Sequence, residues 1–452
     1  MEILKSNKST ILVLGKQEIY HNKVYRPLHF LLFSKIGNVS LVFNTLTKML
    51  ISVSAEELSC LKSEENFVSL VSRELIENWF LVPVSNNDAD LSKGLFNTLT
   101  LLKCSEPPYI NSYTILPTSD CNARCFYCFE ADTQKTNMLL KTARNVVDFI
   151  KKNSSNHKVK IRWFGGEPLY NADAISAICE GLKASNIEFN SCMVSNGYLF
   201  NELIIKQAKE VWNLQQVQIT LDGTESVYNR VKNYIYKDVF SPYKIVLNNI
   251  DNLLNNDISV RIRLNMDSYN ADDLNELAKE LVSRFGKYKN VSVDIRLLYE
   301  NAGVYRAIRS KETRNMLANK LFNLKMFFIN NNIGFKPRLG DGLKLSCCMA
   351  DDDHSVVITP EGNITKCEHH FQDEIVGNIN IGITNFETVK KWKTRIEKGD
   401  KCLDCPIYPL CDHLKNCPEF GVNGLQTYEC KNLINTYSLA VENEFLSINK
   451  EN

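Results

Sequence analysis

Three cysteines, Cys121, Cys125 and Cys128, lie within one stretch of eight residues, CNARCFYC. A cube-shaped four-iron cluster is normally held by four thiolates, one on each iron. A loop that supplies only three leaves one iron open to a small molecule, as a catalytic zinc site keeps one position open. Zinc held by this loop and a distant fourth ligand is the alternative, although zinc sites favour C-x2-C pairs. The C-x3-C-x2-C spacing therefore favours an iron–sulfur cluster.

Fifteen cysteines in the whole chain also need an explanation. The N-terminal stretch lacks the long apolar core of a secretory signal, and no run of about 20 apolar residues could span a membrane. We therefore expect a cytoplasmic protein, in which disulfides are rare and clustered cysteines are usually metal ligands. Eight cysteines crowd into the last quarter of the chain: Cys347, Cys348, Cys367, Cys402, Cys405, Cys411, Cys417 and Cys430.

The charge of the chain is nearly balanced. Lysine and arginine number 53 and aspartate and glutamate number 52, which gives a net charge of +1. This balance provides no general electrostatic attraction to nucleic acid or to an anionic membrane. We therefore expect neither nucleic acid nor a membrane among the partners of this protein.

Strand patterns alternate with amphipathic helical patterns between residues 109 and 335. Such alternation builds a parallel sheet from βα units, and six units could form an open, partial (β/α)6 barrel of the TIM type. Active sites in these folds lie at the C-terminal ends of the strands, and the three-cysteine loop directly follows the first strand. The predicted strands are 113–116, 159–164, 191–194, 217–221, 259–264 and 291–298.

A small α/β module is predicted ahead of the barrel, in residues 1–108. Two β-rich runs flank Gly37 and Asn38, which is a hairpin signal. Ser54, with Glu57 three positions later, predicts a capped helix. The module is further predicted to contain a helix at 66–83 and part of a polar linker at 85–93.

The CNARCFYC stretch resembles the signature of radical S-adenosylmethionine (SAM) enzymes, which carries an aromatic residue before the last cysteine. The resemblance implies that Cys121, Cys125 and Cys128 bind a [4Fe-4S] cluster whose fourth iron chelates SAM. It also implies that an electron from this cluster cleaves SAM to a 5′-deoxyadenosyl radical. Tyr127 would then pack near the adenine.

Motifs at the ends of the next strands are similar to further parts of that family. WFGGEP follows the second strand, and the family's GGEP motif meets the amino group of SAM: the glycines let the backbone approach closely, and the glutamate offers an acceptor to an ammonium. VSNG and ITLDG end the third and fourth strands and are similar to segments that contact the ribose and the methionine. The implied SAM-binding residues are Gly165, Gly166, Glu167, Pro168, Ser195, Asn196, Thr220, Asp222 and Arg230.

Residues 336–452 form a third region with few helix or strand patterns. We expect bound metal to stabilise its fold. Its cysteines resemble the SPASM extension found in peptide-modifying members of the family. Where the SPASM block C-x2-C-x5-C-x3-C has three residues between its third and fourth cysteines, this chain has five. The resemblance assigns Cys402, Cys405, Cys411 and Cys430 to a second auxiliary cluster. It assigns Cys348, Cys367 and Cys417 to a first one, for which Cys347 is the only nearby candidate as the fourth ligand.

The adjacent residues Cys347 and Cys348 make the first auxiliary cluster unusual. Neighbouring residues of an extended chain point to opposite sides, so binding by both would strain the backbone. We therefore expect this cluster to use an uncommon Cys-Cys turn or to keep an open iron.

The leading hypothesis is a radical enzyme that modifies a ribosomally made precursor peptide, forming a thioether or a carbon–carbon crosslink after hydrogen abstraction. The N-terminal module is loosely similar to the element with which such maturases add a leader peptide to a sheet edge. The implied cofactors are three [4Fe-4S] clusters and SAM. The implied partners are the precursor peptide and a reductant such as flavodoxin or ferredoxin.

Two other functions remain open. An anaerobic sulfatase-maturase-like enzyme would oxidise Cys or Ser in a protein, and in that group the acid after the G-x4-C cysteine acts as a base. Glu368 occupies this position, with a solvated surface charge as the alternative role. A non-catalytic iron–sulfur or zinc protein, acting in binding or electron transfer, is the hypothesis from a different class.

Overall fold

The computed structural model describes residues 1–103, 109–155, 158–238, 241–298, 309–341, 343, 345–346, 348–369, 372, 374–394, 400–411, 417 and 426–451. The chain divides into two compact units. The first comprises Met1–Pro107, Lys336–Cys347 and Arg395–Asn452, and the second comprises Pro108–Phe335 and Cys348–Thr394. The region predicted as one C-terminal domain, 336–452, is thus shared between them. No helix in the described ranges is both long and apolar enough to span a membrane.

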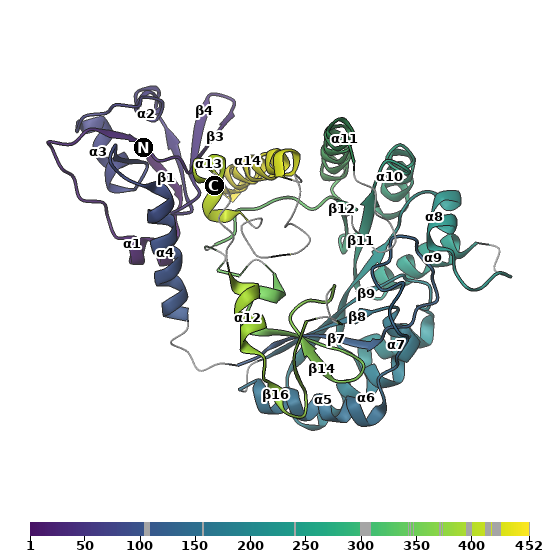
Figure 1. Cartoon of the computed structure of the whole chain (residues 1–452). Helices are drawn as coiled ribbons and strands as arrows, with labels where there is room; N and C mark the ends of the chain where they lie inside the picture. Colours follow the sequence, from purple (N-terminus) through teal and green to yellow (C-terminus); the bar gives the residue numbers. More distant parts are fainter. Residues whose placement is uncertain are drawn as a thin grey trace. The chain divides into compact units, whose positions relative to one another are not determined.

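Six parallel strands form the centre of the second unit and confirm the predicted α/β alternation (Figure 1). They run in the order β12-β11-β10-β9-β8-β7, and β7 takes β13 as its other neighbour, so the strands in the described part of the chain form an open sheet. The arrangement is an open, partial barrel. The strands are β7 (Ser112–Thr118), β8 (Val159–Gly165), β9 (Phe189–Ser195), β10 (Leu214–Thr220), β11 (Ser259–Met266) and β12 (Val291–Leu297).

Helices cover the outer face of this sheet (Figure 1). Alternate strand residues are buried beneath them, as Val260, Ile262 and Leu264 of β11 are, and the apolar side of each helix completes the core. The helical elements are α5 (Leu140–Asn153), η1 (Pro168–Asn171), α6 (Ala172–Ala184), α7 (Glu202–Glu210), α8 (Glu225–Lys232), α9 (Pro242–Asn255), α10 (Asp273–Phe285) and α11 (Lys311–Asn330).

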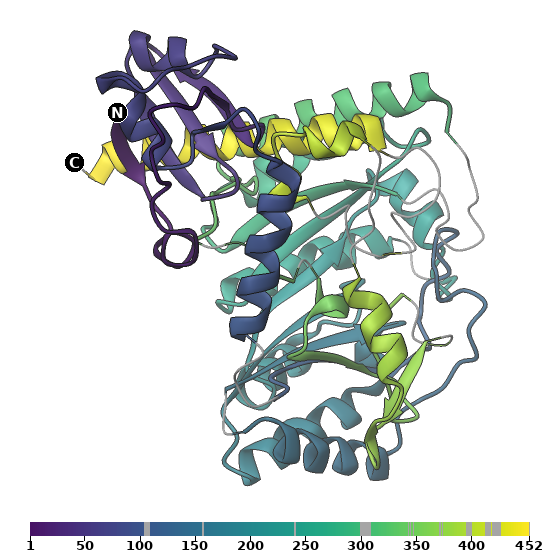
Figure 2. The ribbon, with the colours of Figure 1, turned by 60° about the vertical axis from the view of Figure 1, so that its left-hand side comes forward.

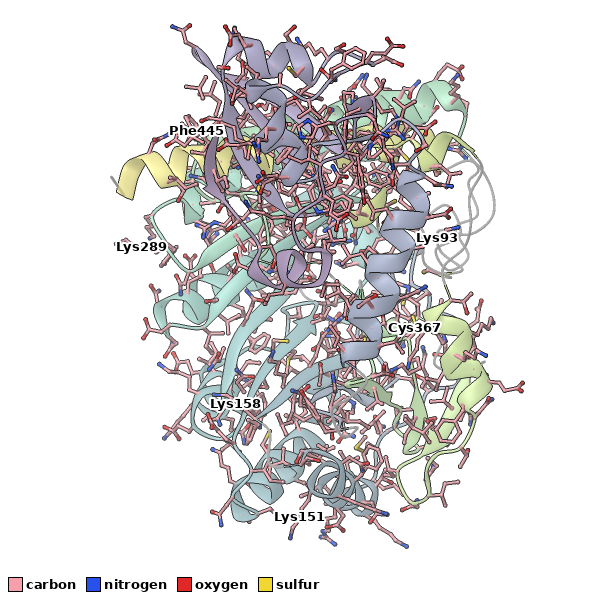
Figure 3. The ribbon with its side chains drawn as sticks, turned by 90° about the vertical axis from the view of Figure 1, so that its left-hand side faces the viewer. Lys93, Lys151, Lys158, Lys289, Cys367 and Phe445 are labelled. Carbon is pink, nitrogen blue, oxygen red and sulfur yellow. The ribbon has the colours of Figure 1, made fainter. Side chains whose placement is uncertain are left out.

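Part of the cysteine-rich region, expected to be irregular, extends the same sheet. β13 pairs in parallel with β7, and the following three strands add in antiparallel order. Cys367, labelled in Figure 3, lies two residues beyond the end of β14. Strands of two to four residues are too short to show a periodic pattern in the sequence. The added elements are η2 (Met349–Asp351), β13 (Ser355–Ile358), β14 (Asn363–Thr365), β15 (Ile375–Asn378), β16 (Gly382–Ile383) and α12 (Phe386–Lys393).

The N-terminal module confirms the predicted hairpin and the helix capped by Ser54, whose capping box with Glu57 is formed. Its four-stranded sheet has the order β1-β5-β4-β3. The helix predicted at 66–83 is shorter and is followed by a strand, and the stretch 85–93 belongs largely to a helix rather than a linker. The elements are β1 (Glu2–Lys5), α1 (Lys8–Leu14), β2 (Tyr25–Pro27), β3 (Leu31–Ile36), β4 (Val39–Asn44), β5 (Met49–Val53), α2 (Ala55–Cys60), α3 (Leu70–Glu77), β6 (Leu81–Pro83) and α4 (Asp88–Lys103).

The C-terminal part of the chain completes the first unit by packing on this module. Helix α14 (Gln426–Glu451) lies against β3, as Figures 1 and 2 both show. The short helix α13 (Asp400–Leu403) is followed in the sequence by η3 (Tyr408–Leu410). The Tyr408 ring stacks on Phe30 with ring centroids 5.7 Å apart. The Thr45 hydroxyl donates to the carbonyl oxygen of Pro406 at 2.6 Å. The two ends of the sequence therefore share one core.

Candidate functional site

The cysteine loop begins where β7 ends and is held by segments that follow later strands. The backbone N–H of Arg124 donates to the carbonyl oxygen of Lys232 at 2.8 Å, and that of Ile235 donates to the carbonyl oxygen of Asn122 at 2.9 Å. The side-chain amide of Asn196 donates to Asn122 Oδ1 at 2.6 Å. Residues beyond β9 and β10 thus fix the loop at the carboxyl edge of the sheet, where ligand sites of open α/β sheets lie.

The three thiols of the loop are half-buried. Burial raises the pKa of the Cys121 thiol to about 12 and that of the Cys128 thiol to about 11, and it also raises the pKa of Cys125. Metal binding must therefore release protons from these thiols. Among the described residues, no three His, Cys, Asp or Glu side chains converge closely enough to hold one metal ion. A four-iron cluster takes each thiolate on a different iron, so three spread thiols on one loop fit that group.

The GGEP turn at the end of β8 lies directly against the cysteine loop. Gly165 has a φ of 120°, a conformation that favours glycine. A Cβ at Gly165 would lie 2.2 Å from the carbonyl oxygen of Thr118, and one at Gly166 would lie 2.1 Å from that of Asp120. The N–H of Glu167 donates to the same Asp120 oxygen at 2.8 Å. Only glycines allow this close approach of two backbone segments.

The Glu167 carboxylate joins the ends of the second and third strands. It accepts hydrogen bonds from Ser195 Oγ at 2.9 Å and from the N–H groups of Asn196 at 2.8 Å and Leu169 at 3.3 Å. Pro168, also buried, follows as the first residue of η1. Burial raises the pKa of Glu167 to about 7. In this structure the glutamate organises the SAM-binding candidates around it, and its contact with an ammonium remains a prediction.

Asp222, two residues after the end of β10, contacts both Tyr127 and Lys232. The sequence analysis did not single out this lysine. Asp222 Oδ2 accepts from the Tyr127 hydroxyl at 2.6 Å and from Lys232 Nζ at 2.9 Å, and Lys232 also donates to the Tyr127 hydroxyl at 3.2 Å. The Lys232 side chain is 4% exposed. Thr220 is half-buried at the strand end, whereas Arg230 is exposed and not brought to this group. The buried cation of the site is Lys232.

One signal could have found Lys232. It lies two positions after Arg230 near the end of α8, and Tyr228 and Val231 of this helix are buried with it. A basic residue on the apolar side of an amphipathic helix needs a buried acid as its partner. Asp222, which precedes the helix, was already a candidate.

Glu368, the candidate base, pairs with a strand residue of the barrel. Its Oε1 accepts from Arg162 Nη2 at 2.8 Å, and its side chain is 12% exposed. Burial alone would raise the pKa of Glu368, but the charges of Arg162 and His369 outweigh this effect and hold it below its ordinary value. The pKa of the Cys348 thiol is raised by burial and, in part, by the Glu368 charge. Glu368 is therefore an ionised carboxylate beside a candidate cluster ligand.

The cysteines predicted for the second auxiliary cluster all lie in the first unit. Cys402, Cys405 and Cys411 are half-buried between the start of α13 and the residue that follows η3, and they pack against the core of the N-terminal module. The N–H of Cys405 donates to the carbonyl oxygen of Cys402 at 3.1 Å. Cys430 is half-buried on α14.

The cysteines predicted for the first auxiliary cluster are divided. Cys348 and Cys367 belong to the second unit, and Cys417 belongs to the first. Cys347 lies outside the described residues, so the expected strain of an adjacent pair stays a prediction.

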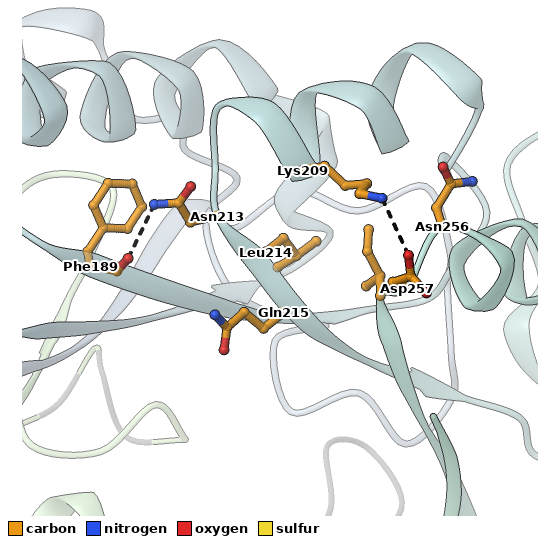
Figure 4. Close-up of a pocket in the computed structure, with 8 residues that line it drawn as sticks. Phe189, Lys209, Asn213, Leu214, Gln215, Asn256 and Asp257 are labelled. Atoms are coloured by element: carbon orange, nitrogen blue, oxygen red, sulfur yellow. Dashed lines mark hydrogen bonds and ion pairs between the residues drawn. The ribbon is translucent and has the colours of Figure 1, made fainter. Parts of the chain in front are cut away.

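A pocket of about 290 Å³ lies at the opposite end of the barrel strands (Figure 4). It is lined by the first residues of β9 and β10, Phe189 and Leu214, and by Ile258, just before β11. Lys209 and Asp257 form an ion pair of 3.9 Å at its rim. In βα folds the amino-terminal edge contributes stability and the carboxyl edge the chemistry, so this pocket is separate from the candidate site.

Comparison with known proteins supports an iron–sulfur cluster at the cysteine loop. A family described as a 4Fe-4S single cluster domain matches residues 113–234, which contain the cysteine loop, the GGEP turn and Lys232. GTP 3′,8-cyclase of Clostridium perfringens (strain SM101) is 26% identical over 274 residues, covering 56% of this chain and 78% of that protein.

Two solved structures share the fold. A histidine-tagged form of anSMEcpe with bound AdoMet superimposes with a TM-score of 0.60 at 19% identity, covering 76% of this chain and all of that one. SuiB of Streptococcus suis, determined with S-adenosylmethionine and also with its precursor peptide SuiA, has a TM-score of 0.51 at 14% identity, covering 86% and 95% of the two chains. At these identities the likeness concerns the fold.

Proposed function

We propose that this chain, which has the fold of radical SAM enzymes with a SPASM-like extension, modifies a ribosomally made precursor peptide. The observation that carries the proposal is the meeting of the cysteine loop, the GGEP turn and the Asp222–Lys232 pair at the carboxyl ends of β7, β8 and β10. The peptide substrate is supported by SuiB, a protein of similar fold that binds the precursor peptide SuiA.

Each part of the site has a role in this proposal. The three loop cysteines would hold a [4Fe-4S] cluster. Gly165 and Gly166 allow the backbone of the GGEP turn to lie close to this loop. When bound, the cluster and SAM would supply radical chemistry that begins with removal of a hydrogen atom from an unactivated carbon. Glu167 fixes Ser195 and Asn196 at the third strand end, and Lys232 with Asp222 fixes Tyr127. These contacts preorganise the donors that would bind SAM.

The finer chemistry also belongs to the proposal. The tail cysteines would hold two auxiliary clusters, three clusters in all, and the product would be a thioether or a carbon–carbon crosslink. An open iron at the first auxiliary cluster would favour the thioether, because it could hold a substrate thiolate in place. A reductant such as flavodoxin or ferredoxin would supply the electron.

The test is SAM cleavage by the anaerobically reconstituted, reduced protein. We expect 5′-deoxyadenosine from the wild type, none from Cys125→Ala, and wild-type amounts from Cys60→Ala, which removes a half-buried thiol of the N-terminal module. Tail iron should persist in Cys125→Ala. Undiminished 5′-deoxyadenosine from Cys125→Ala would refute the radical assignment, and no cleavage by the wild type would favour a non-catalytic iron–sulfur protein.

A second candidate is the oxidation of Cys or Ser in a protein, as in a sulfatase-maturase-like enzyme. The ionised Glu368, held by Arg162 near Cys348, is the observation that favours it. Mass spectrometry of the product separates the two, because oxidation to formylglycine leaves a reactive aldehyde and a crosslink does not. A Glu368→Gln variant with unchanged product formation would remove Glu368 as the base.

A further inference from the structure

The inner face of the barrel sheet carries polar side chains. On β11, Val260, Ile262 and Leu264 point to the helices and are buried, whereas the intervening Arg261 and Arg263 are half-buried. Inner faces of βα barrels are ordinarily filled with valine, isoleucine and leucine. A polar inner face that is not fully buried is suited to contact a polar molecule.

The charges on this face are mostly positive. The inward positions of β8–β12 include five basic residues and one acidic residue: Lys160, Arg162, Arg261, Arg263 and Arg296 against Asp294. The strand register groups them by level. Arg261 is aligned with Gln218, and Arg263 with Thr220 on one side and Asp294 on the other.

Only some of these cations are paired. Asp294 accepts from Arg263 at 3.0 Å and from Arg296 at 3.4 Å, and Arg162 is paired with Glu368. Arg261 lies over the Phe335 ring at 5.9 Å from its centroid, and no carboxylate among the described residues pairs with it. Arg261 therefore lies over an aromatic ring without a carboxylate partner among the described residues.

The positive charges of this face affect the pKa values of two neighbouring groups. The Cys192 thiol, on β9, has its pKa raised by burial, but both Arg162 and Arg261 oppose this rise, so the two guanidiniums lie near the same thiol. The pKa of Lys325 is lowered to about 8, first by burial and then by Arg296, with Arg263 acting in the same direction against Asp294. The positive charges of this face therefore act on both neighbouring groups.

We propose that the substrate segment bound on this face is acidic and that one of its carboxylates pairs with Arg261. The inference rests on the proposed function and names the class of its peptide. Arginine binds a carboxylate through two parallel hydrogen bonds, and the Phe335 ring holds the guanidinium ready for it. Arg261 is aligned with Gln218, two residues before Thr220, and therefore lies about 7 Å below the level at which β10 ends. An extended peptide covers that distance in two residues, so the acidic residue lies about two positions from the modified one.

The test measures binding of two fluorescein-labelled synthetic peptides to the full-length, cluster-loaded protein. The peptides are twelve residues long and identical, except that one carries glutamate where the other carries glutamine. We expect the glutamate peptide to bind roughly tenfold more tightly at low ionic strength, with a smaller difference at 0.15 M salt. Arg261→Gln should remove this preference, and Arg261→Lys should retain part of it, because it keeps the charge without the paired donors.

Lys151→Gln is the matched control. Lys151 is exposed in the last turn of α5, on the outer side of the barrel (Figure 3), and carries the same charge. Its removal should leave the preference unchanged, and thermal unfolding checks that the Arg261 variants are folded. Equal binding of both peptides by the wild type, or an equal loss in Lys151→Gln and Arg261→Gln, would overturn the proposal. Displacement of the glutamate peptide by GTP at lower concentration than by unlabelled peptide would assign the face to a nucleotide and overturn it too.

These outcomes are distinct from a failure of the proposed function. SAM cleavage is measured without peptide on the wild-type and Lys151→Gln proteins. If cleavage is absent while the glutamate preference persists, the radical assignment fails and the anion site stands. If cleavage occurs without any preference, the acidic substrate fails and the radical assignment stands.

Discussion

The buried pair of Lys232 and Asp222 has a direct bearing on the cysteine loop. Both side chains are almost completely removed from solvent, and they share the Tyr127 hydroxyl, one residue before Cys128. The carbonyl oxygen of Lys232 also accepts from Arg124 in the same loop. A change at Lys232 therefore affects the loop through its side chain and through the end of its helix.

We expect Lys232→Met to lower the free energy of unfolding by about 3–5 kcal/mol, because removal of one partner leaves Asp222 as an uncompensated buried charge. Lys232→Arg, which keeps the charge, should lose less. Arg230→Ala, at an exposed position of the same helix, should change it by less than about 0.5 kcal/mol. Urea unfolding of the apoprotein measures all three. Equal stability of Lys232→Met and wild type would contradict the role of the pair.

Lys325 gives a pH dependence of known sign. Its pKa in the folded protein is about 8, below the ordinary value of 10.5, chiefly because of burial. Between these two pH values the unfolded chain binds more protons than the folded one, so the free energy of unfolding should rise with pH because of this group. Lys325→Met should lack this part of the rise, on the order of 2 kcal/mol. Urea titrations at the two ends of this pH window provide the measurement, and identical pH profiles would rule out the lowered pKa.

The turn between β8 and η1 positions the cysteine loop through backbone contacts. Gly166 is in contact with the carbonyl oxygen of Asp120, which leads into the loop, and Glu167 donates to the same oxygen. The distance between the two segments is set by the absence of a side chain at Gly166.

Gly166→Ala should therefore displace the loop and lose most of its cluster, because the new Cβ would lie 2.1 Å from that oxygen. Iron content and visible absorption of the reconstituted protein report the loss. Gly94→Ala is the matched control: a Cβ at Gly94, inside α4, meets nothing within 4 Å, and alanine in a helix interior should stabilise it by about 0.5–1 kcal/mol. A full loop cluster in Gly166→Ala would show that the close approach is dispensable.

The first unit joins both ends of the chain, which affects how the N-terminal module can be tested. Besides the Phe30–Tyr408 stack, Ser34 donates to Glu442 at 2.7 Å and Lys5 pairs with Glu444 at 2.7 Å. A truncation designed to remove a peptide-binding module also removes the surface on which the second set of tail cysteines packs.

Deletion of residues 1–103 should therefore release residues 400–411 and 426–451 to proteolysis and lose the iron of the proposed second auxiliary cluster. The cysteine loop should keep its iron, because the second unit has its own core. Limited proteolysis with mass spectrometry, together with iron analysis, tests both statements. Protection of residues 400–411 and 426–451 equal to that in the full-length protein would show that they fold without the module.

The sequence alone was sufficient for the parts of this protein that depend on local spacing. Three cysteines within eight residues, the GGEP turn and the six barrel strands all follow from patterns a few residues long.

Tertiary structure decided the rest. Positions 230 and 232 are about 200° apart around an α-helix, so packing of α8 exposes the arginine and buries the lysine. Alternation along β11 predicts that Arg261 and Ile262 face opposite sides, but only the tertiary structure shows that Arg261 lies over the Phe335 ring and that no described carboxylate pairs with it. Such contacts join residues about a hundred positions apart, and no local pattern encodes which distant side chain will be the neighbour.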